Sequence, residues 1–285
     1  MLRRSRKPGP QPVTWAVGID LGGTWVRAAA VDHRGRRRSF VGPTPGLAKL
    51  PTLIRRLWHR WGFAPEEVAA LVVASRGVWT RAERRVEQRR LRGAARHVRV
   101  ISDVEAAYHG ALGARPGVLL LAGTGSIALG RDARGRWARA GGLGPLLGDE
   151  GSAFWIGREW LRAAARQRGR RPGRRLGAAP DAIIRIAALA PAVLRRARRG
   201  DRAARLIVAT AHHALAQLLR WTARDLRLRP PIALSWAGSL LDDAGFRGSV
   251  WRAARRQGVR LALVRPRQDA AGAAARLAAE LARRA

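Results

Sequence analysis

The chain has 285 residues, of which 47% are hydrophobic, so it can bury a sizeable core and divide into two domains. It contains no cysteine, which excludes disulfides, thiolate zinc sites and cysteine-bound iron–sulfur clusters. The 56 basic and 19 acidic residues give a net charge of +37, and such a charge attracts nucleic acid without regard to its sequence.

No apolar run reaches the ~20 residues of a membrane-spanning helix, and prolines interrupt the basic N-terminus where a signal peptide would be apolar. We therefore expect a cytoplasmic protein with no membrane partner. Lysine occurs only at Lys7 and Lys49, asparagine is absent, and arginine is spread along the whole chain. This bias indicates a GC-rich genome, and no helix-turn-helix, zinc-finger or RNA-binding motif accompanies it.

The first part of the chain predicts an α/β domain. Residues 1–12 are basic and rich in proline, which predicts a disordered tail. The domain at 13–113 is expected to begin with three strands, at about 14–20, 25–31 and 37–41. These are followed by a helix at about 47–61, a strand at 70–74, a helix at 81–90, a strand that ends at Ser102 and a helix that runs to Leu112. This order is typical of a ribonuclease-H-like domain.

The second part repeats this order with longer helices. In the domain predicted at 114–285, a second three-strand meander starts at Val118 and is followed by helices at about 152–167, 180–198 and 202–227. A strand, helix, strand and helix then run from Ile232 to the end. Residues 166–180 are rich in arginine and glycine, which predicts a mobile loop.

The first hairpin turn carries Gly22, Gly23 and Thr24, directly after a strand that delivers Asp20. Another strand follows instead of a helix, so this is not the dinucleotide fingerprint, and no Walker lysine occurs. The turn is either an ordinary hairpin or half of a nucleotide site, in which glycine lets backbone N–H groups approach a phosphate closely.

Asp103 follows a buried strand and begins a helix. An acidic residue at that position is a common helix cap. Catalytic groups of α/β proteins also gather at the carboxyl ends of strands. A carboxylate between two phosphate-binding turns would accept the proton of a substrate hydroxyl.

A second glycine turn, Gly123-Thr124-Gly125-Ser126, joins two more apolar strands. Further on, Asp149 and Glu150 lie in a glycine-bounded segment just before an apolar helix start. Two glycine hairpins on either side of a carboxylate predict a nucleotide site of the kind built without a Walker loop.

On these elements the chain resembles the BadF/BadG/BcrA/BcrD ATPase family, which includes N-acetylglucosamine kinase and glucosamine kinase and lies in the sugar kinase–actin–Hsp70 superfamily. The resemblance runs roughly from Val13 to the C-terminus. Its most specific pieces are GIDLGGT from Gly18, GTGS from Gly123 and GGLGPLLGDEGSAFWIG from Gly141. It implies an α/β fold of two ribonuclease-H-like, actin-like ATPase domains with the nucleotide cleft between them.

The resemblance also implies roles for individual residues. Asp103 would be the general base, and Asp20 would hold Mg²⁺ through water. ATP would be bound by two phosphate loops and an adenosine loop, at Gly22, Gly23 and Thr24, at Gly123, Thr124 and Gly125, and at Ala237, Gly238 and Ser239. The sugar would be lined by Asp103, Ser126, Gly142, Gly144 and Asp149.

Three residues depart from the family pattern. Ser102 stands where the family has asparagine before the base, and Leu143 stands where the N-acetylglucosamine kinases have tryptophan. Ile127 stands where the eukaryotic enzymes have asparagine. The phosphate-binding residues are therefore present, whereas polar groups that would grip an acetamido sugar are missing.

We predict an ATP- and Mg²⁺-dependent kinase of an amino sugar such as N-acetylglucosamine or glucosamine. One alternative is a BadF/BadG-type ATPase that drives or senses a partner protein, and another is a nucleotide-binding module that has lost catalysis. The absence of cysteine excludes the iron–sulfur activator branch of the family. The expected partners are a small sugar and, through charge alone, nucleic acid, while a homodimer stays open.

Overall fold

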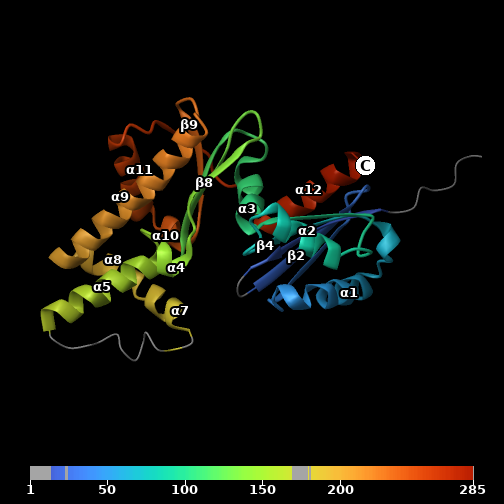
Figure 1. The fold of residues 1–285 in the computed structure, drawn as a ribbon, viewed down its shortest axis with the longest axis horizontal. Helices are drawn as coiled ribbons and strands as arrows, with labels where there is room; N and C mark the ends of the chain where they lie inside the picture. The colour runs from blue at the N-terminus through green and yellow to red at the C-terminus, as the bar shows by residue number, and fades with distance from the viewer. Residues whose placement is uncertain (1–13, 23–24, 169–178, 180, 285) are drawn as a thin grey trace, which may run out of the picture. The chain divides into compact units, whose positions relative to one another are not determined.

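The computed structural model describes residues 14–22, 25–168, 179 and 181–284. The chain divides into two compact units, one formed by the chain up to Gly110 together with Gln268 onward, the other by Ala111–Arg267 (Figure 1). The expected tail at 1–12 and most of the expected loop at 166–180 lie outside the described residues.

The first unit is built on a five-stranded sheet with the order β3-β2-β1-β4-β5. Its strands are β1 (Trp15–Leu21), β2 (Trp25–Asp32), β3 (Arg37–Pro43), β4 (Val68–Ser75) and β5 (His97–Ser102). The first three strands are antiparallel, whereas β4 and β5 run parallel to β1. Central strands β1 and β4 are buried along nearly their whole length, as expected for strands covered on both faces.

Helices cover both faces of this sheet. They are α1 (Leu50–Trp61), α2 (Arg81–Arg90), α3 (Asp103–Leu112) and α12 (Ala270–Arg284), with short 3-10 turns at Leu47–Lys49 and Pro65–Glu67. Because side chains alternate along a strand, Val17 packs with α1 on one face while Ala16 packs with α12 on the other. The predicted elements of this unit are confirmed to within three residues at each end.

The domain prediction is wrong for the last helix, since residues 268–285 were expected in the second domain and belong to the first unit. Helix α12 packs on β1 and β4. Its buried face is made of alanines, among them Ala271, Ala274 and Ala275, and this lets the helix approach the sheet closely. At Gly18 the approach is so close that a Cβ atom would lie 2.0 Å from the backbone nitrogen of Ala275.

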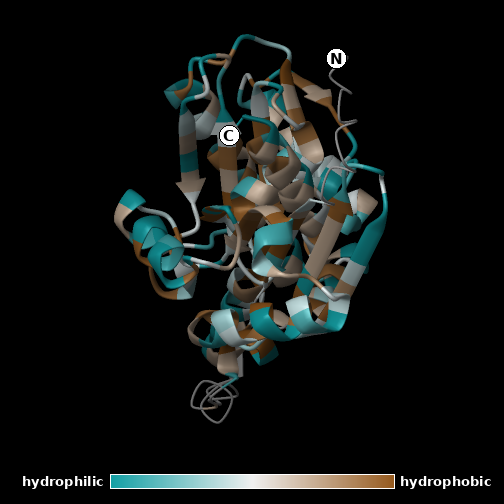
Figure 2. Cartoon of the chain, turned by 90° about the vertical axis from the view of Figure 1, so that its right-hand side faces the viewer, coloured by the Kyte–Doolittle hydropathy of each residue, from teal (hydrophilic) through white to brown (hydrophobic). Residues whose placement is uncertain are grey.

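The second unit has a five-stranded sheet with the order β10-β9-β6-β7-β8. Its strands are β6 (Gly117–Ala122), β7 (Ser126–Arg131), β8 (Trp137–Gly141), β9 (Ile232–Ala237) and β10 (Leu261–Leu263). Its described helices are α4 (Gly144–Leu147), α5 (Ala153–Arg168), α7 (Ala182–Ala187), α8 (Ala190–Arg198), α9 (Arg202–Asp225), α10 (Ser239–Asp242) and α11 (Ala244–Arg256). Helices are brown on some turns and teal on others, as expected of helices with one buried side (Figure 2).

The two sheets share one topology. Counted from the first strand of each unit, both have the order third, second, first, fourth, fifth, with the first three antiparallel and the rest parallel. The hairpin after each second strand is also repeated, as DxRGR at 32–36 and at 132–136. In these turns Asp32 and Asp132 each accept the backbone N–H groups two and four residues on, at 2.8–3.0 Å. The expected repeat is confirmed.

The helix predicted at 180–198 is two helices, α7 and α8. Pro191 lies in the first turn of α8. Proline has no N–H to donate and its ring clashes with the carbonyl four residues before it, so it starts a helix instead of continuing one.

Replacing Gly18 with alanine should destabilise the protein, by roughly 1–3 kcal/mol or more, because both backbones are held by hydrogen bonds and cannot yield easily. Gly248→Ala in α11 is the control: its Cβ meets only the Arg252 guanidinium, at 3.6 Å. Alanine in a helix should keep or raise stability there. Denaturant unfolding followed by tryptophan fluorescence measures both variants. Equal stability of Gly18→Ala and the wild type would contradict the close packing of α12 on β1.

Candidate functional site

Polar residues gather where the parallel strands of the first sheet end. In the strand register, Leu21 lies beside Ser75, which lies beside Ser102. The residues next to these positions are Asp20 in β1, Arg76 after β4 and Asp103 at the start of α3. The sheet therefore brings the predicted metal-binding and catalytic carboxylates to one edge.

The environment of Asp20 disfavours its charged form. Burial and, second to it, the charge of Asp103 raise the pKa of Asp20 to about 6, against the opposing charge of Arg27. Asp269, which caps the first turn of α12 by accepting the Gly272 N–H at 2.8 Å, also raises this pKa. The fold thus holds an acidic group whose negative charge is only partly compensated.

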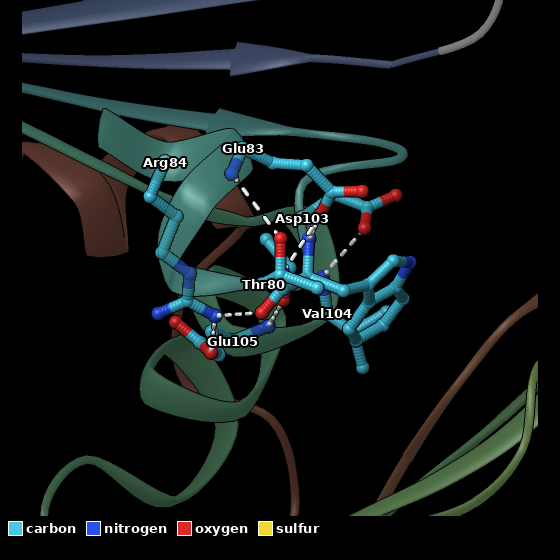
Figure 3. Close-up of polar contacts among 8 residues, drawn as sticks. Thr80, Glu83, Arg84, Asp103, Val104 and Glu105 are labelled. Carbon is cyan, nitrogen blue, oxygen red and sulfur yellow. Dashed lines mark hydrogen bonds and ion pairs between the residues drawn. The ribbon is translucent and has the colours of Figure 1, made fainter. Parts of the chain in front are cut away.

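Asp103 is held by the first turn of its own helix. Its Oδ1 atom accepts the N–H of Val104 at 2.9 Å (Figure 3). Burial raises the pKa of the Asp103 carboxyl, while the bond from Val104 and the charge of Arg76 lower it. A partly buried carboxylate with a raised pKa suits a general base, because its affinity for a proton is higher than that of a solvated carboxylate.

The two carboxylates also suit a cation. Each is desolvated, and Asp103 disfavours the ionisation of Asp20, so a divalent ion nearby would relieve the repulsion. Among the described residues, no group of three or more His, Asp or Glu side chains is placed to hold a metal.

The first glycine turn is closed by Gly22, whose N–H donates to the carbonyl of Trp25 at 3.0 Å. A Cβ atom at Gly22 would lie 2.8 Å from that oxygen, so the turn needs glycine there. Gly23 and Thr24 lie outside the described residues, and their expected contact with phosphate stays a prediction.

The second glycine turn is tied to the start of α5. Gly123 donates to the carbonyl of Gly125 at 2.9 Å, which closes the turn between β6 and β7. The carbonyls of Gly123 and Thr124 accept the N–H groups of Ala153 and Phe154, at 2.8 and 3.3 Å. The turn is therefore held rigidly while the Thr124 side chain stays exposed.

The Asp149 carboxylate packs against this turn. A Cβ atom at Gly125 would be 2.9 Å from Asp149 Oδ2, so the carboxylate can approach the turn only because Gly125 has no side chain. Asp149 has a left-handed backbone, with φ of 59°, and its Oδ1 accepts the Ser126 N–H at 3.3 Å. Ser126 Oγ donates to the Glu150 carbonyl at 2.8 Å, so it can only accept a further hydrogen bond.

The other sequence-predicted residues of the second unit fall into two groups. Gly142 follows β8 and donates its N–H to the Ser126 carbonyl at 2.9 Å, whereas Gly144 begins α4 and a Cβ atom there would meet nothing within 4 Å. Ala237, Gly238 and Ser239 form the loop from β9 to α10. A Cβ atom at Gly238 would lie 2.4 Å from the Ala122 carbonyl, so this loop touches the second glycine turn.

Two departures from the family pattern have different surroundings. Ile127 is buried beside Gly142, where a Cβ atom would be 2.6 Å from Ile127 Cδ1. Leu143 is 61% exposed, on the same segment as Leu146, which is 91% exposed. Ile127 and Leu143 thus place one buried and one exposed apolar side chain beside the residues expected to line a sugar.

Sequence reasoning missed three charged residues that act on the carboxylates, namely Arg76, Arg27 and Asp269. The signal for Arg76 was present, since it follows β4 just as Asp103 follows β5. Asp269 could not be found in this way, because its role depends on α12 joining the first unit.

A search of the described residues for membrane spans found no helix with the length and apolar character that crossing a bilayer requires.

Residues 17–274 match the BadF/BadG/BcrA/BcrD ATPase family. The chain is 30% identical over 162 residues to an N-acetylmuramic acid/N-acetylglucosamine kinase of Clostridium acetobutylicum, covering 53% of each. It is 52% identical over 46 residues to an N-acetyl-D-glucosamine kinase of Dictyostelium discoideum, covering 16% of this chain and 14% of the relative. The chain thus spans about half the length of the first relative and less of the second.

The fold is similar to that of a candidate N-acetylglucosamine kinase of Chromobacterium violaceum, with a TM-score of 0.66 and 23% identity. The similarity covers 94% of this chain and 99% of that one. The predicted α/β fold class is confirmed, since each of the two units carries a mixed five-stranded sheet covered by helices.

Asp20→Asn should stabilise the unliganded protein at neutral pH. The pKa of Asp20 is about 6 in the folded protein against 3.8 in the unfolded chain, so between these values the folded state binds more protons and its stability falls as pH rises. Asparagine removes this loss, which is at most about 3 kcal/mol. Denaturant unfolding at pH 4, 6 and 8 should show the variant's advantage absent at pH 4 and complete by pH 8. An advantage that does not change with pH would contradict the assignment.

Proposed function

This chain belongs to the BadF/BadG/BcrA/BcrD ATPase family, and on that basis we propose that it is an ATP-dependent phosphotransferase that acts on an amino sugar such as N-acetylglucosamine or glucosamine. The observation that carries the proposal is the pair of partly buried carboxylates, Asp20 and Asp103, at the carboxyl edge of the first sheet. Both curated relatives are named as sugar kinases, and this supports the same reaction.

In the proposed reaction, Asp103 accepts the proton of a sugar hydroxyl. The freed oxygen forms a bond to the γ-phosphorus of ATP while the bond from that phosphorus to the bridging oxygen breaks, so that ADP leaves and a sugar phosphate remains. The raised pKa of Asp103 helps this step because the carboxylate then holds the proton more firmly.

Backbone groups would hold the phosphates. We assign this role to the turns at Gly22, Gly23 and Thr24 and at Gly123, Thr124 and Gly125, and contact with adenosine to Ala237, Gly238 and Ser239. Mg²⁺, held through water by Asp20, would neutralise phosphate charge. Ser126, Gly142, Gly144 and Asp149 would line the sugar.

The competing function is an ATPase that drives or senses a partner protein, and it would use the same nucleotide-binding groups. Measuring ATP turnover across a panel of amino and neutral sugars, with a no-sugar blank, separates the two. Stimulation by an amino sugar supports the kinase, hydrolysis that ignores sugar supports the ATPase, and ATP binding without turnover supports a module that has lost catalysis.

We also propose a cytoplasmic location and a weak, sequence-independent attraction for nucleic acid. The second rests on the net charge of +37 alone. It would weaken steeply as salt rises, because each neutralised phosphate releases counterions.

Asp103→Asn should abolish phosphotransfer while leaving ATP affinity and the fold largely unchanged. Asparagine keeps the shape and can still accept the Val104 N–H, but it cannot take up the proton. General-base catalysis is worth about 10²–10⁴-fold in rate. Steady-state kinetics with the sugar that stimulates turnover is the measurement, and a variant that keeps more than about a tenth of wild-type kcat would refute the role.

Gly125→Val should weaken ATP binding, because the new side chain would meet the Asp149 carboxylate and distort the turn. Gly248→Val in α11 is the control, because its backbone is not left-handed and a Cβ atom there meets only the flexible Arg252 guanidinium, at 3.6 Å. Calorimetry on both folded variants gives the nucleotide affinities. If Gly125→Val binds ATP as well as Gly248→Val does, the turn has only a structural role.

A further inference from the structure

The Asp103 carboxylate is held by its own turn. In the described part of the chain its hydrogen bonds come from the backbone of that turn, chiefly from the Val104 N–H at 2.9 Å. The direction of the carboxylate therefore depends on where the first turn of α3 lies.

Two contacts fix that turn. Ser102 Oγ is buried and accepts the N–H of Glu105 at 3.1 Å, which caps the helix. The Glu105 carboxylate is itself buried and accepts Arg84 Nη2 of helix α2 at 2.5 Å (Figure 3). Since Glu105 is two residues from Asp103, this ion pair ties the base-bearing turn to α2.

Arg84 also holds the loop that precedes α2. The same Nη2 atom donates to the Trp79 carbonyl at 3.3 Å. The same end of the loop is closed by a capping box, in which Glu83 donates its N–H to Thr80 Oγ1 at 3.1 Å and accepts the Thr80 N–H at 2.7 Å (Figure 3). Glu83 also accepts the Trp79 N–H at 2.8 Å.

This loop carries Arg76, the cation that lowers the pKa of Asp103. Asp20 from β1 also interacts with Asp103, whose charge raises the Asp20 pKa, and Asp20 in turn faces Arg27 and Asp269. A shift of the loop relative to α3 would therefore change the charge balance at Asp103 as well as its direction.

A purely stabilising role explains the pair poorly. Buried ion pairs contribute little net stability, because both charges lose their water. In addition, Arg84 Nε is buried with no hydrogen-bond partner in the described part of the chain.

We propose that the Arg84–Glu105 ion pair is the positioning element for Asp103: it fastens Trp79, at the end of the loop that carries Arg76, to the first turn of α3, and so sets both the direction of the Asp103 carboxylate and its distance from Arg76. Its catalytic consequence rests on the proposed function. Its structural consequence, a defined charge environment at Asp103, does not.

The test is Glu105→Gln in the full chain, which keeps the shape and an oxygen acceptor but removes the charge that holds Arg84. Burial of Asp103 would persist while the attraction from Arg76 weakens, so the Asp103 pKa should rise. We expect a rise of about half a unit to one unit, part of the 1–3 units that a nearby opposite charge supplies. The acidic limb of kcat/KM should move to higher pH by the same amount, and kcat should fall about ten- to hundredfold.

Glu87→Gln is the matched control. Glu87 is buried to the same degree as Glu105 and pairs with Arg90 at 3.0 Å, but that pair lies within α2 and does not reach α3. It should lower stability comparably while leaving the acidic limb unmoved. If Glu105→Gln does not fold, Arg84→Lys keeps the charge without the planar fork and should shift the limb in the same direction by less.

A second readout does not need turnover. Carboxyl ¹³C NMR titration of the full chain, with the Asp103 signal assigned by its loss in Asp103→Asn, measures the Asp103 pKa directly. If no sugar supports turnover but Glu105→Gln still raises this pKa relative to Glu87→Gln, the proposed function fails and the positioning role stands. If the two variants give the same Asp103 pKa, the positioning role is wrong, whatever the enzyme does.

Discussion

The first sheet can carry two desolvated carboxylates at its edge because both of its faces are covered, and the cover on the second face depends on the contact between α12 and Gly18. The missing side chain lets the backbone of α12 lie almost against β1, and alanines continue the contact along the helix. A helix packed this closely keeps water from that side of β1. The raised pKa of Asp20 is a consequence of that packing, in which burial is the largest contribution.

The two units share one topology, but different kinds of residue follow their strands at the carboxyl edge of the sheet. In the first unit the strands of the carboxyl edge lead to charged residues, Asp20, Arg76 and Asp103. In the second unit the same edge leads to glycines and small residues, in the turn after β6 and in the loop after β9. Glycine leaves backbone N–H groups accessible to a phosphate. In the proposed reaction the first unit would therefore supply both carboxylates and one glycine turn, and the second unit would supply the other glycine turn.

Much of the fold could be predicted from the sequence because the strands are short apolar runs and the helices are amphipathic. The failures have specific causes. Which sheet α12 covers could not be read from its own pattern, since its alanines would fit either sheet, and only the Gly18 contact decides it. The break before α8 was readable from Pro191. The Arg84–Glu105 pair was not, because 21 residues separate its members and arginine is abundant everywhere.

The contacts of Ser102, Ile127 and Leu143 show that these three departures from the family pattern have different structural consequences. Ser102 replaces asparagine, yet its hydroxyl oxygen accepts the Glu105 N–H, and serine and asparagine cap helices about equally well. That change leaves the base-bearing turn intact. Ile127 instead packs against Gly142, so an apolar side chain stands where the eukaryotic enzymes have a polar one. Together with the exposed Leu143, it changes the surface that an acceptor would meet while the groups that would bind phosphate and take the proton are kept. Under the proposed function, the groups assigned to the transfer step are therefore present, and the surface assigned to the sugar is the part that differs from the family pattern.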